Sequence, residues 1–443
     1  MFDTIVAIAS GNINQAISII RISGPDAFLI ISKIFTGIIG EDKTISFGYI
    51  VDENKNRLDE VLVNVFRGKN NFVGEDTIEI NAHGGIVITD MILELIVSFG
   101  ARYATPGEFS RRAFLNGKLD LIKAEAINDL IHAKTKLQTK IAVQKFNNKS
   151  SALILELIKE IEYIIGVCEV NIDYPEYDDV DKMDNDKLVQ SINGLLIKIN
   201  QIIKVSEENQ VFIVPQTIVI AGLPNVGKSA LMNAILNEEK SIVTNIAGTT
   251  RDVVEGEIIF NNIILKFKDT AGIRKSEDTI EKMGIEKSYT EIENANIILH
   301  VVDANAKEQD VDQKIALLSK DKIYFKVFNK SDLLSQPAAA GLKEQILISA
   351  KNNDIGQLEK AFDHHFKNVD IESSSFFNNR QTALLKQGKN LLQEALEAIG
   401  NDMGFDVVIV DVVAAWESIK SIVGAINKED LLDSIFANFC LGK

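Results

Sequence analysis

The chain has 443 residues, of which 46% are hydrophobic and 25% charged, and at roughly 150 residues per domain this length predicts about three globular domains. The 63 acidic and 47 basic residues give a net charge of −16, which excludes a general nucleic-acid binder unless basic residues gather on one face. No apolar run approaches the ~20 residues of a membrane-spanning helix, and Cys168 and Cys440 are the only cysteines, so we expect a cytoplasmic protein without a disulfide framework.

The first segment, residues 1–117, mixes short strands with a helix. Runs rich in β-branched residues predict three strands, and a longer run with helical spacing predicts one helix. The strands are Ile5–Ile8, Val61–Val65 and Thr77–Ile80, and the helix is Ile86–Val97. This mixture is typical of an α+β domain.

Two further segments, residues 118–209 and 376–443, have a helical period, because their apolar residues recur at steps of three and four. An acidic, proline-containing stretch from Asp173 to Asp186 predicts a loop between two helices of the first segment. The run Val407–Val413 is β-branched and would suit a strand. Helix is favoured there because one face keeps its apolar residues: Val408, Val412, Ala415, Ile419 and Ile422.

Residues 210–375 alternate short apolar strands with polar helices, which is typical of a parallel-sheet α/β domain. The simplest arrangement joins the two helical segments into one domain. The α/β domain is then inserted between them, because surface loops tolerate the insertion of a domain. The sequence therefore predicts a multidomain chain with an N-terminal α+β domain, a discontinuous helical domain and an inserted α/β domain.

The strongest motif, Gly222–Ser229, matches the pattern G-x-x-x-x-G-K-[ST] and follows directly on the predicted strand Thr217–Ala221. In this strand–loop–helix context the loop N–H groups face phosphates, Lys228 reaches the β/γ oxygens and the Ser229 hydroxyl holds Mg²⁺. A plain glycine-rich turn is the alternative, and the flanking strand and helix disfavour it.

Three more nucleotide motifs follow in the expected order. Asp269–Gly272 brings a carboxylate near Mg²⁺ and a glycine near the γ-phosphate. In Asn329–Asp332, the Asp332 carboxylate accepts from both the ring N1–H and the exocyclic amine of guanine, a pair of donors that adenine lacks. Ser349–Lys351 supplies a second base-contacting loop. Together the motifs predict a P-loop domain that binds GTP rather than ATP.

The residues that carry out hydrolysis are not decided by these motifs. Thr249 or Thr250 closes over Mg²⁺ in the first switch. The position after the second motif, where Ras-like enzymes place a glutamine, is Ile273, which cannot orient water. Spacing alone does not choose among the polar residues that follow, which are Glu277, Asp278, Glu281 and Glu286.

Beyond these nucleotide motifs, the chain resembles the tRNA modification GTPase MnmE (TrmE) family from end to end. The matching stretches lie in all three predicted domains, and the terminal Cys-x-Gly-Lys is foreign to general GTPases. They are Arg21–Gly24, Gly74–Asp76 with Glu79, His83–Gly85, Pro106–Phe109, Arg112–Asn116, Lys118–Ala126, Pro224–Asn225, Asn245–Asp252 and Phe439–Lys443.

The resemblance implies the ligands of the nucleotide site. It assigns Mg²⁺ to Ser229 and Thr250. It assigns K⁺ to Asn225, Thr244, Ile246 and Thr249. Together with the motifs, it assigns the GTP contacts to Asn225, Val226, Gly227, Lys228, Ser229, Ala230, Thr244, Asn245, Ile246, Ala247, Gly248, Thr249, Thr250, Asp269, Thr270, Ala271, Gly272, Asn329, Lys330, Asp332, Ser349, Ala350 and Lys351.

The resemblance also implies the chemistry. The K⁺ ion stands where other GTPases insert an arginine finger, and the carboxylate that orients water corresponds to Glu281. With the flavoprotein MnmG, which binds FAD and NADH, the family adds an aminomethyl or carboxymethylaminomethyl group to the wobble uridine of certain tRNAs. Methylenetetrahydrofolate provides the methylene carbon.

The N-terminal domain is similar to a tetrahydrofolate-binding fold that also mediates homodimerisation. The resemblance implies that a 5,10-methylene or 5-formyl tetrahydrofolate contacts Arg21, Glu79, Lys118 and Lys443. It presents Cys440 toward this region as a candidate catalytic residue, although a cysteine on an apolar helix face is usually a buried structural one. Cys168 is expected in the core.

One stretch departs from the family. Ala9–Ala16 holds a single glycine where relatives carry a proline- and glycine-rich loop, which restricts conformations with positive φ and adds side chains near the expected folate site. Two alternatives follow. One is a switch that has lost folate chemistry. The other is a ribosome-assembly GTPase, which would add a basic RNA-binding domain or a second GTPase domain, and the sequence has neither.

Overall fold

A computed structural model of the chain describes residues 3–173, 185–237, 257–260, 262–267, 289–334, 345–366, 376–425, 429–440 and 442. The chain forms two compact units. The first contains Met1–His132, Ala142–Asn200 and Asn379–Lys443, and the second contains Ala133–Ile141 and Gln201–Asn378. The second unit therefore interrupts the first, as expected for an inserted domain. Within the described ranges no helix is long and apolar enough to cross a membrane.

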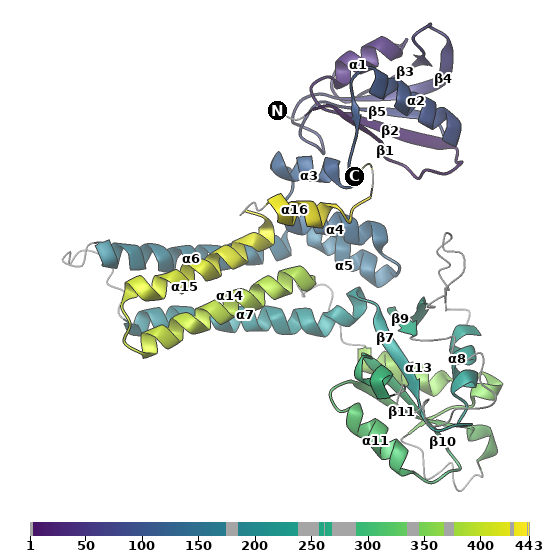
Figure 1. Ribbon diagram of the computed structural model, residues 1–443, viewed down its shortest axis with the longest axis vertical. Helices are drawn as coiled ribbons and strands as arrows, with labels where there is room; N and C mark the ends of the chain where they lie inside the picture. The colour runs from purple at the N-terminus through teal and green to yellow at the C-terminus, as the bar shows by residue number, and fades with distance from the viewer. Residues whose placement is uncertain are drawn as a thin grey trace. The chain divides into compact units, whose positions relative to one another are not determined.

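The N-terminal part of the first unit is a six-stranded sheet in the order β3-β4-β5-β2-β1-β6 (Figure 1). Its neighbouring strands are antiparallel except for β1 and β6, which are parallel. The strands are β1 (Ile5–Ile8), β2 (Ile17–Ser23), β3 (Thr44–Val51), β4 (Arg57–Phe66), β5 (Thr77–His83) and β6 (Arg102–Tyr103), and the helices are α1 (Ala27–Ile34), α2 (Ile86–Ser98) and α3 (Glu108–Leu115).

The two faces of this sheet differ because side chains alternate along each strand. Ile20 and Ile22 of β2 belong to the buried cluster that α1 and α2 cover. Arg21 lies between them and so belongs to the other face, directly opposite Glu79 of β5 in the strand register. On that face a smaller cluster includes Phe109 of α3. The alternation thus separates a structural face from a face that carries charge.

The rest of the first unit is helical, and segments far apart in the sequence lie side by side in it (Figure 1). Helix α15 packs against both α14 and α6, and the run Val407–Val413 lies within α15, so the helical prediction is confirmed. The helices are α4 (Leu121–His132), α5 (Lys136–Phe146), α6 (Lys149–Asp173), α7 (Asn185–Ile213), α14 (Asn379–Gly400), α15 (Phe405–Val423) and α16 (Glu429–Phe436).

A buried ion pair ties three of these helices together. The Arg380 guanidinium, at the start of α14, donates to both carboxylate oxygens of Glu125 in α4 at 2.7 and 2.9 Å. It also donates to the backbone carbonyls of Ser421 and Ile422 near the end of α15, at 3.3 and 3.1 Å. Gln381 adds a further hydrogen bond to Glu125. The carboxylate thus meets most of its hydrogen-bonding capacity inside the helical domain.

The second unit contains a six-stranded sheet in the order β12-β11-β10-β7-β9-β8, and all its neighbours are parallel except β8 and β9. Its strands are β7 (Gln216–Ala221), β8 (Glu257–Phe260), β9 (Ile263–Phe267), β10 (Ile297–Asp303), β11 (Ile323–Asn329) and β12 (Ile346–Leu347). Its helices are α8 (Lys228–Asn237), α11 (Asp310–Leu318) and α13 (Gly356–Phe366), with short 3-10 turns η1 (Ser331–Leu333) and η2 (Ala350–Asn352).

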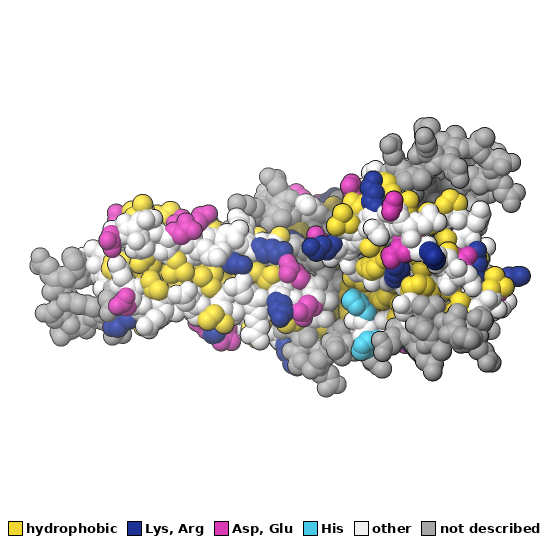
Figure 2. Space-filling view, turned by 90° about the horizontal axis from the view of Figure 1, so that it is seen from below, with side chains coloured by type: hydrophobic (Ala, Val, Ile, Leu, Met, Phe, Trp, Pro, Cys, Tyr) yellow, Lys and Arg dark blue, Asp and Glu magenta, His cyan; other side chains and the backbone are white. Residues whose placement is uncertain are grey.

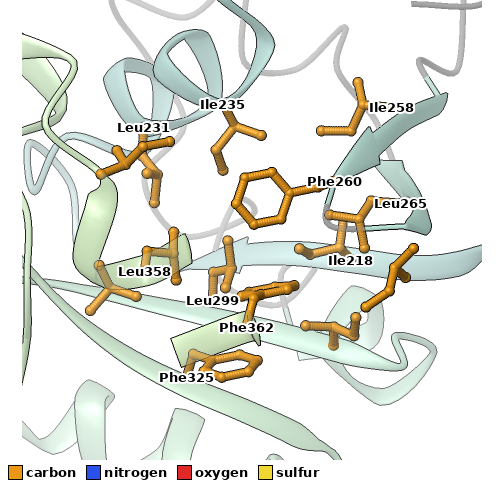
Figure 3. Packing of buried hydrophobic residues seen from close by; sticks show 14 of the residues in the cluster. Ile218, Leu231, Ile235, Ile258, Phe260, Leu265, Leu299, Phe325, Leu358 and Phe362 are labelled. Atoms are coloured by element: carbon orange, nitrogen blue, oxygen red, sulfur yellow. The ribbon is translucent and has the colours of Figure 1, made fainter. Parts of the chain in front are cut away.

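Helices cover both faces of this sheet. On one face α8 and α13 pack over the strands through a large apolar cluster (Figure 3). Phe362 of α13 stacks on Phe325 of β11 with ring centroids 4.6 Å apart and meets Phe260 of β8 edge-on at 5.1 Å. On the other face Ile315 of α11 joins a second cluster. Strands with helices on both faces form the predicted α/β domain.

Candidate guanine-nucleotide site

The P-loop turns sharply between β7 and α8 because its glycines adopt conformations closed to other residues. Gly222 has a φ of +146°, and a Cβ there would lie 2.2 Å from the carbonyl oxygen of Val301 in β10. Asn225 and Gly227 also have positive φ, at 63° and 98°. Helix α8 begins at Lys228, so the loop N–H groups and the helix N-terminus share one end of the sheet.

The side-chain amide of Asn329 holds three loops at this edge of the sheet. Its Nδ2 donates to the carbonyl of Val226 in the P-loop at 2.8 Å, and its Oδ1 accepts from the N–H of Ala350 at 3.0 Å. Asn329 is 3% exposed, so neither hydrogen bond competes with water. A Cβ on Gly227 would lie 2.2 Å from Asn329 Nδ2. The second glycine of the P-loop is therefore required by this contact.

The two base-contacting loops are also joined to each other. The Ser349 hydroxyl donates to Asp332 Oδ1 at 2.6 Å, and the N–H of Ser331 donates to the carbonyl of Ile348 at 3.0 Å. The Asp332 side chain is on the exposed surface. The structure therefore brings together the predicted guanine-recognition residues Asn329, Lys330, Asp332, Ser349, Ala350 and Lys351 at the ends of β11 and β12.

Lys228 shows that the loop is suited to an anion. Its ammonium donates to the carbonyl oxygens of Gly222 and Leu223, at 2.9 and 2.7 Å. Burial lowers the pKa of Lys228, because desolvation disfavours the charged form. Among the residues that the structure describes, no carboxylate forms an ion pair with it. A phosphate oxygen would supply the negative charge that this half-buried cation lacks.

Sequence reasoning missed Asp303, at the end of β10. Its carboxylate pairs with the Lys330 ammonium at 2.8 Å and accepts from the N–H of Asn305. Burial would raise the pKa of Asp303, but these hydrogen bonds outweigh it and the pKa is lowered. The pair orients Lys330, whose φ of 64° is left-handed. The sequence feature that could have identified Asp303 is an aspartate directly after an apolar run. That run forms β10, which lies beside the strand that carries Asn329.

Ser229 and Ala230 follow Lys228 in the first turn of α8. The other candidates of the nucleotide site lie outside the described residues. They comprise the first switch, the Asp269–Gly272 motif and the predicted water-orienting carboxylate. They are Thr244, Asn245, Ile246, Ala247, Gly248, Thr249, Thr250, Asp269, Thr270, Ala271, Gly272 and Glu281.

A second candidate site lies on the charged face of the N-terminal sheet. Arg21 donates to Glu79 Oε1, with Nε at 2.9 Å and Nη2 at 2.7 Å, and its guanidinium lies 5.5 Å from the ring centre of Phe109. Lys118 is exposed, and a Cβ on Gly74 would lie 3.1 Å from its Cε, so Lys118 runs along the Gly74 loop. Lys443 lies outside the described residues.

The C-terminus docks onto this same domain. Arg21 Nη1 donates to the carbonyl of Gly442 at 3.1 Å, and a Cβ on Gly442 would lie 2.1 Å from the carbonyl oxygen of Ile8. The N–H of Gly107 donates to the carbonyl of Cys440 at 3.3 Å. Cys440 is partly exposed. Cys168 is buried, as predicted, and burial raises the pKa of its thiol to about 11.

Buried charges hold the elements around this face. Arg112 of α3 is 1% exposed and donates to Glu108 at 2.9 Å and to Glu75 at 3.1 Å. Burial would raise the pKa of Glu108, but hydrogen bonds from Arg102 and Arg112 help to lower it to about 2. Glu75 also accepts from the Ser23 hydroxyl at 2.9 Å. Strand β2, the Gly74 loop and α3 are therefore joined by one network.

The departing stretch Ala9–Ala16 does not need the glycines of the family. None of its residues has a positive φ. It pairs with the His83–Gly85 turn, since the N–H of Gln15 donates to the carbonyl of Gly84 and the N–H of Gly84 donates to that of Ala16. A Cβ on Gly84 would lie 2.3 Å from the carbonyl oxygen of Gln15. The glycine that this pairing requires is therefore Gly84 of the turn, and this chain has a glycine at that position.

The α/β fold, the P-loop and the guanine-recognition loops define a P-loop GTPase domain, here inserted into a helical domain that follows an α+β domain. Two family models match the chain: "GTP-binding protein TrmE N-terminus" over residues 4–118 and "MnmE helical domain" over residues 121–440. The chain belongs to the MnmE family.

Relatives named tRNA modification GTPase MnmE match along their full length. The protein of Mycoplasmopsis pulmonis is 54% identical, with all of each chain covered, and that of Mycoplasma mobile is 48% identical with the same coverage. The Bacillus velezensis protein is 39% identical, again with all of each chain covered. The two family models and the observed fold together confirm the multidomain architecture expected from the sequence.

The contact between Gly227 and Asn329 yields a first prediction. Gly227→Ala adds a Cβ into the Asn329 amide and strains a backbone with positive φ, at a cost of about 1–3 kcal/mol. We expect GTP affinity to fall roughly 10- to 100-fold in equilibrium titrations with a fluorescent GTP analogue.

Gly194→Ala is the matched control, because a Cβ at Gly194 in α7 meets nothing within 4 Å and alanine favours helix. Its GTP affinity should equal that of the unmodified chain. Unchanged affinity in Gly227→Ala would show that the P-loop tolerates the displacement.

Proposed function

We propose that the chain is a K⁺-dependent GTPase that acts with an MnmG-type flavoprotein to modify the wobble uridine of certain tRNAs. The group added is aminomethyl or carboxymethylaminomethyl, and a tetrahydrofolate derivative supplies its methylene carbon. The observation that carries this proposal is the combination of a P-loop joined to two guanine-recognition loops with full-length similarity to proteins named tRNA modification GTPase MnmE.

In the proposed mechanism the chain's own residues hold the nucleotide. Lys228 and the P-loop N–H groups bind the phosphates, Asp332 accepts from the guanine ring, and Ser229 with Thr250 holds Mg²⁺. Bound Mg²⁺ and K⁺ supply positive charge to the phosphate oxygens. The proposed K⁺ ligands are Asn225, Thr244, Ile246 and Thr249. Asn225 fits this role because it is exposed on the P-loop with a left-handed backbone.

The apolar Ile273 stands where a glutamine would act in Ras-like enzymes, so another residue must orient water. We propose Glu281 for this role because the resemblance to the MnmE family implies it. A carboxylate can accept a proton from the attacking water, which an isoleucine side chain cannot.

GTP turnover tests both assignments. We expect turnover by the full-length chain to be much faster in K⁺ than in Na⁺, and Glu281→Ala to lower the K⁺-stimulated rate about a hundredfold or more with GTP affinity unchanged. Turnover is measured by phosphate release at matched ionic strength. Glu286→Ala removes a carboxylate close in sequence and should leave the rate unaltered. Equal rates in the two salts would contradict the cation assignment, and normal turnover in Glu281→Ala would remove that residue from the mechanism.

The folate site is proposed on the charged face of the N-terminal sheet, at Arg21, Glu79, Lys118 and Lys443. Arg21 and Glu79 offer donors and acceptors side by side for a ring that carries both. The ammonium of Lys118 would face the negative charge of the glutamate tail. Cys440 is proposed near this site because the C-terminal segment docks onto the same domain.

Titration with 5-formyltetrahydrofolate tests this site. Arg21→Gln removes charge-assisted hydrogen bonds worth about 1.5–3 kcal/mol, so we expect affinity to fall roughly tenfold or more, measured by calorimetry on the full chain. The control is Arg57→Gln, since Arg57 lies on the exposed surface over the Tyr49 ring, 4.0 Å from its centre. If the unmodified chain does not bind the folate, the chain is a switch without folate chemistry.

The rival function is a ribosome-assembly GTPase. Mass spectrometry of tRNA nucleosides from a strain lacking this protein separates the two. We expect the wobble-uridine modification to disappear and to return with the unmodified gene, but not with a Gly227→Ala version. An unaltered wobble uridine in the deletion strain would favour the rival.

The remaining organisation is also part of the proposal. We assign residues 1–117 to a folate-binding-like domain that mediates homodimerisation, and residues 118–209 and 376–443 to the helical domain. Residues 210–375 form the GTPase domain. The assembly with the flavoprotein is expected to be a heterotetramer in the cytoplasm.

A further inference from the structure

One stretch of the chain has a charge opposite to that of the whole. Between Asp129 and Glu156 there is no acidic residue, although at 63 acidic residues in 443 a stretch of this length would hold about four. The same stretch contains five lysines, which are Lys134, Lys136, Lys140, Lys145 and Lys149. In the face of the molecule that Figure 2 shows, basic and acidic side chains are interspersed. A purely basic stretch is therefore unusual for this protein.

Helix α5 begins in this stretch, and its N-terminal half is firmly seated in the second unit. Ile141 is 3% exposed within the apolar cluster of the GTPase domain, and Leu137 packs against the same cluster. The side chain of Gln138 donates to the carbonyls of Phe212 and Ile213 at the end of α7, at 3.2 Å each. These contacts determine which side of the helix faces outward.

The outward side carries Lys136, Thr139 and Lys140, all exposed, and we name these three residues the α5 basic face. Lys136 and Lys140 are one helical turn apart, so their side chains leave the helix about 5–6 Å from each other. Neither lysine forms an ion pair with a carboxylate among the described residues. The neighbouring Lys134 differs, because it pairs with Glu257 of β8.

A solvated surface is the ordinary explanation for two exposed lysines. Three features favour a binding role here. The sequence stretch has no acidic residue, and Lys136 and Lys140 form no ion pair with any described residue, unlike Lys134 and Lys145. The helix is also held by the apolar cluster behind it. Lysine ammonium groups are among the groups that contact nucleic-acid phosphates, whereas the Thr139 hydroxyl already donates to the carbonyl of Thr135 at 3.2 Å. Since the net charge of −16 opposes approach of RNA elsewhere, a tRNA-modifying protein needs a local basic face.

We propose that the α5 basic face binds the phosphate backbone of the tRNA substrate. The inference deepens the proposed function, on which its choice of tRNA rests. Phosphate contacts position the tRNA without reading its sequence. The face lies on the unit that contains the GTPase domain, so the bound tRNA would contact the unit that hydrolyses GTP.

The test compares the full-length chain with Lys136→Gln/Lys140→Gln. Binding of a tRNA transcript with a wobble uridine is measured by fluorescence anisotropy between 50 and 200 mM KCl. Each lysine–phosphate contact steepens the slope of log affinity against log salt concentration by about one unit. Between 50 and 200 mM this is a roughly threefold larger loss of affinity. Between 50 and 200 mM KCl we expect the affinity of the unmodified chain to fall by a factor about ten times larger than that of the double variant. At 50 mM the double variant should bind tRNA more weakly than the unmodified chain.

Lys320→Gln/Lys360→Gln is the matched control. It makes the same change in net charge on exposed residues of the second unit, outside α5, and should bind tRNA as the unmodified chain does. GTP turnover without tRNA should be the same in all three proteins.

Wild-type affinity and salt slope in the α5 variant would overturn the proposal. Equal weakening in both variants would also overturn it, because net charge would then explain the effect. Loss of flavoprotein binding with tRNA binding intact would assign the face to the protein partner instead. Failure of the unmodified chain, alone or with its flavoprotein, to bind any tRNA would contradict the proposed function itself.

Discussion

The nucleotide site depends on one buried side-chain amide. Asn329 links the P-loop to the two loops that follow β11 and β12, and it does so out of contact with water. A neutral amide suits this position because it donates on one side and accepts on the other. The glycine at 227 is a consequence of the same contact, since no side chain fits between the loop and the amide. The base and phosphate halves of the site are thereby held at one fixed spacing.

The N-terminal domain uses a comparable constraint at its charged face. Strand register places Arg21 opposite Glu79, and the docked C-terminal segment adds the Gly442 carbonyl to the same guanidinium. Because Gly442 lies so close to the backbone of Ile8, a side chain at position 442 would push the C-terminal segment away. The two ends of the chain therefore build this face together.

Between these regions the chain must leave the first unit and return to it. The Glu125–Arg380 pair lies close in sequence to two of the four passages between the units, the one after His132 and the one before Asn379. A bidentate pair with two further carbonyl contacts is costly to break, because it would leave a buried charge unpaired. The pair therefore stabilises the packing of α4 against α14 and α15.

The sequence alone was sufficient to predict the class of fold and to locate the P-loop and the guanine-recognition motif. The P-loop and the guanine motif are short, continuous and tied to strand ends, so local pattern was enough to identify them and to predict the inserted arrangement. Strands such as β2 and β10 were not predicted, and with β10 the sequence reading missed Asp303.

Which distant residues meet depends on the folded structure. It placed Arg21 beside Glu79 and Gly442, Asp303 beside Lys330, and Glu125 beside Arg380. The folded structure also determines that Lys136 and Lys140 of α5 face outward, because the apolar cluster behind Leu137 and Ile141 belongs to strands and helices from elsewhere in the chain. Periodicity shows that a helix has two faces, but the partner that buries one of them is set by packing over long sequence distances.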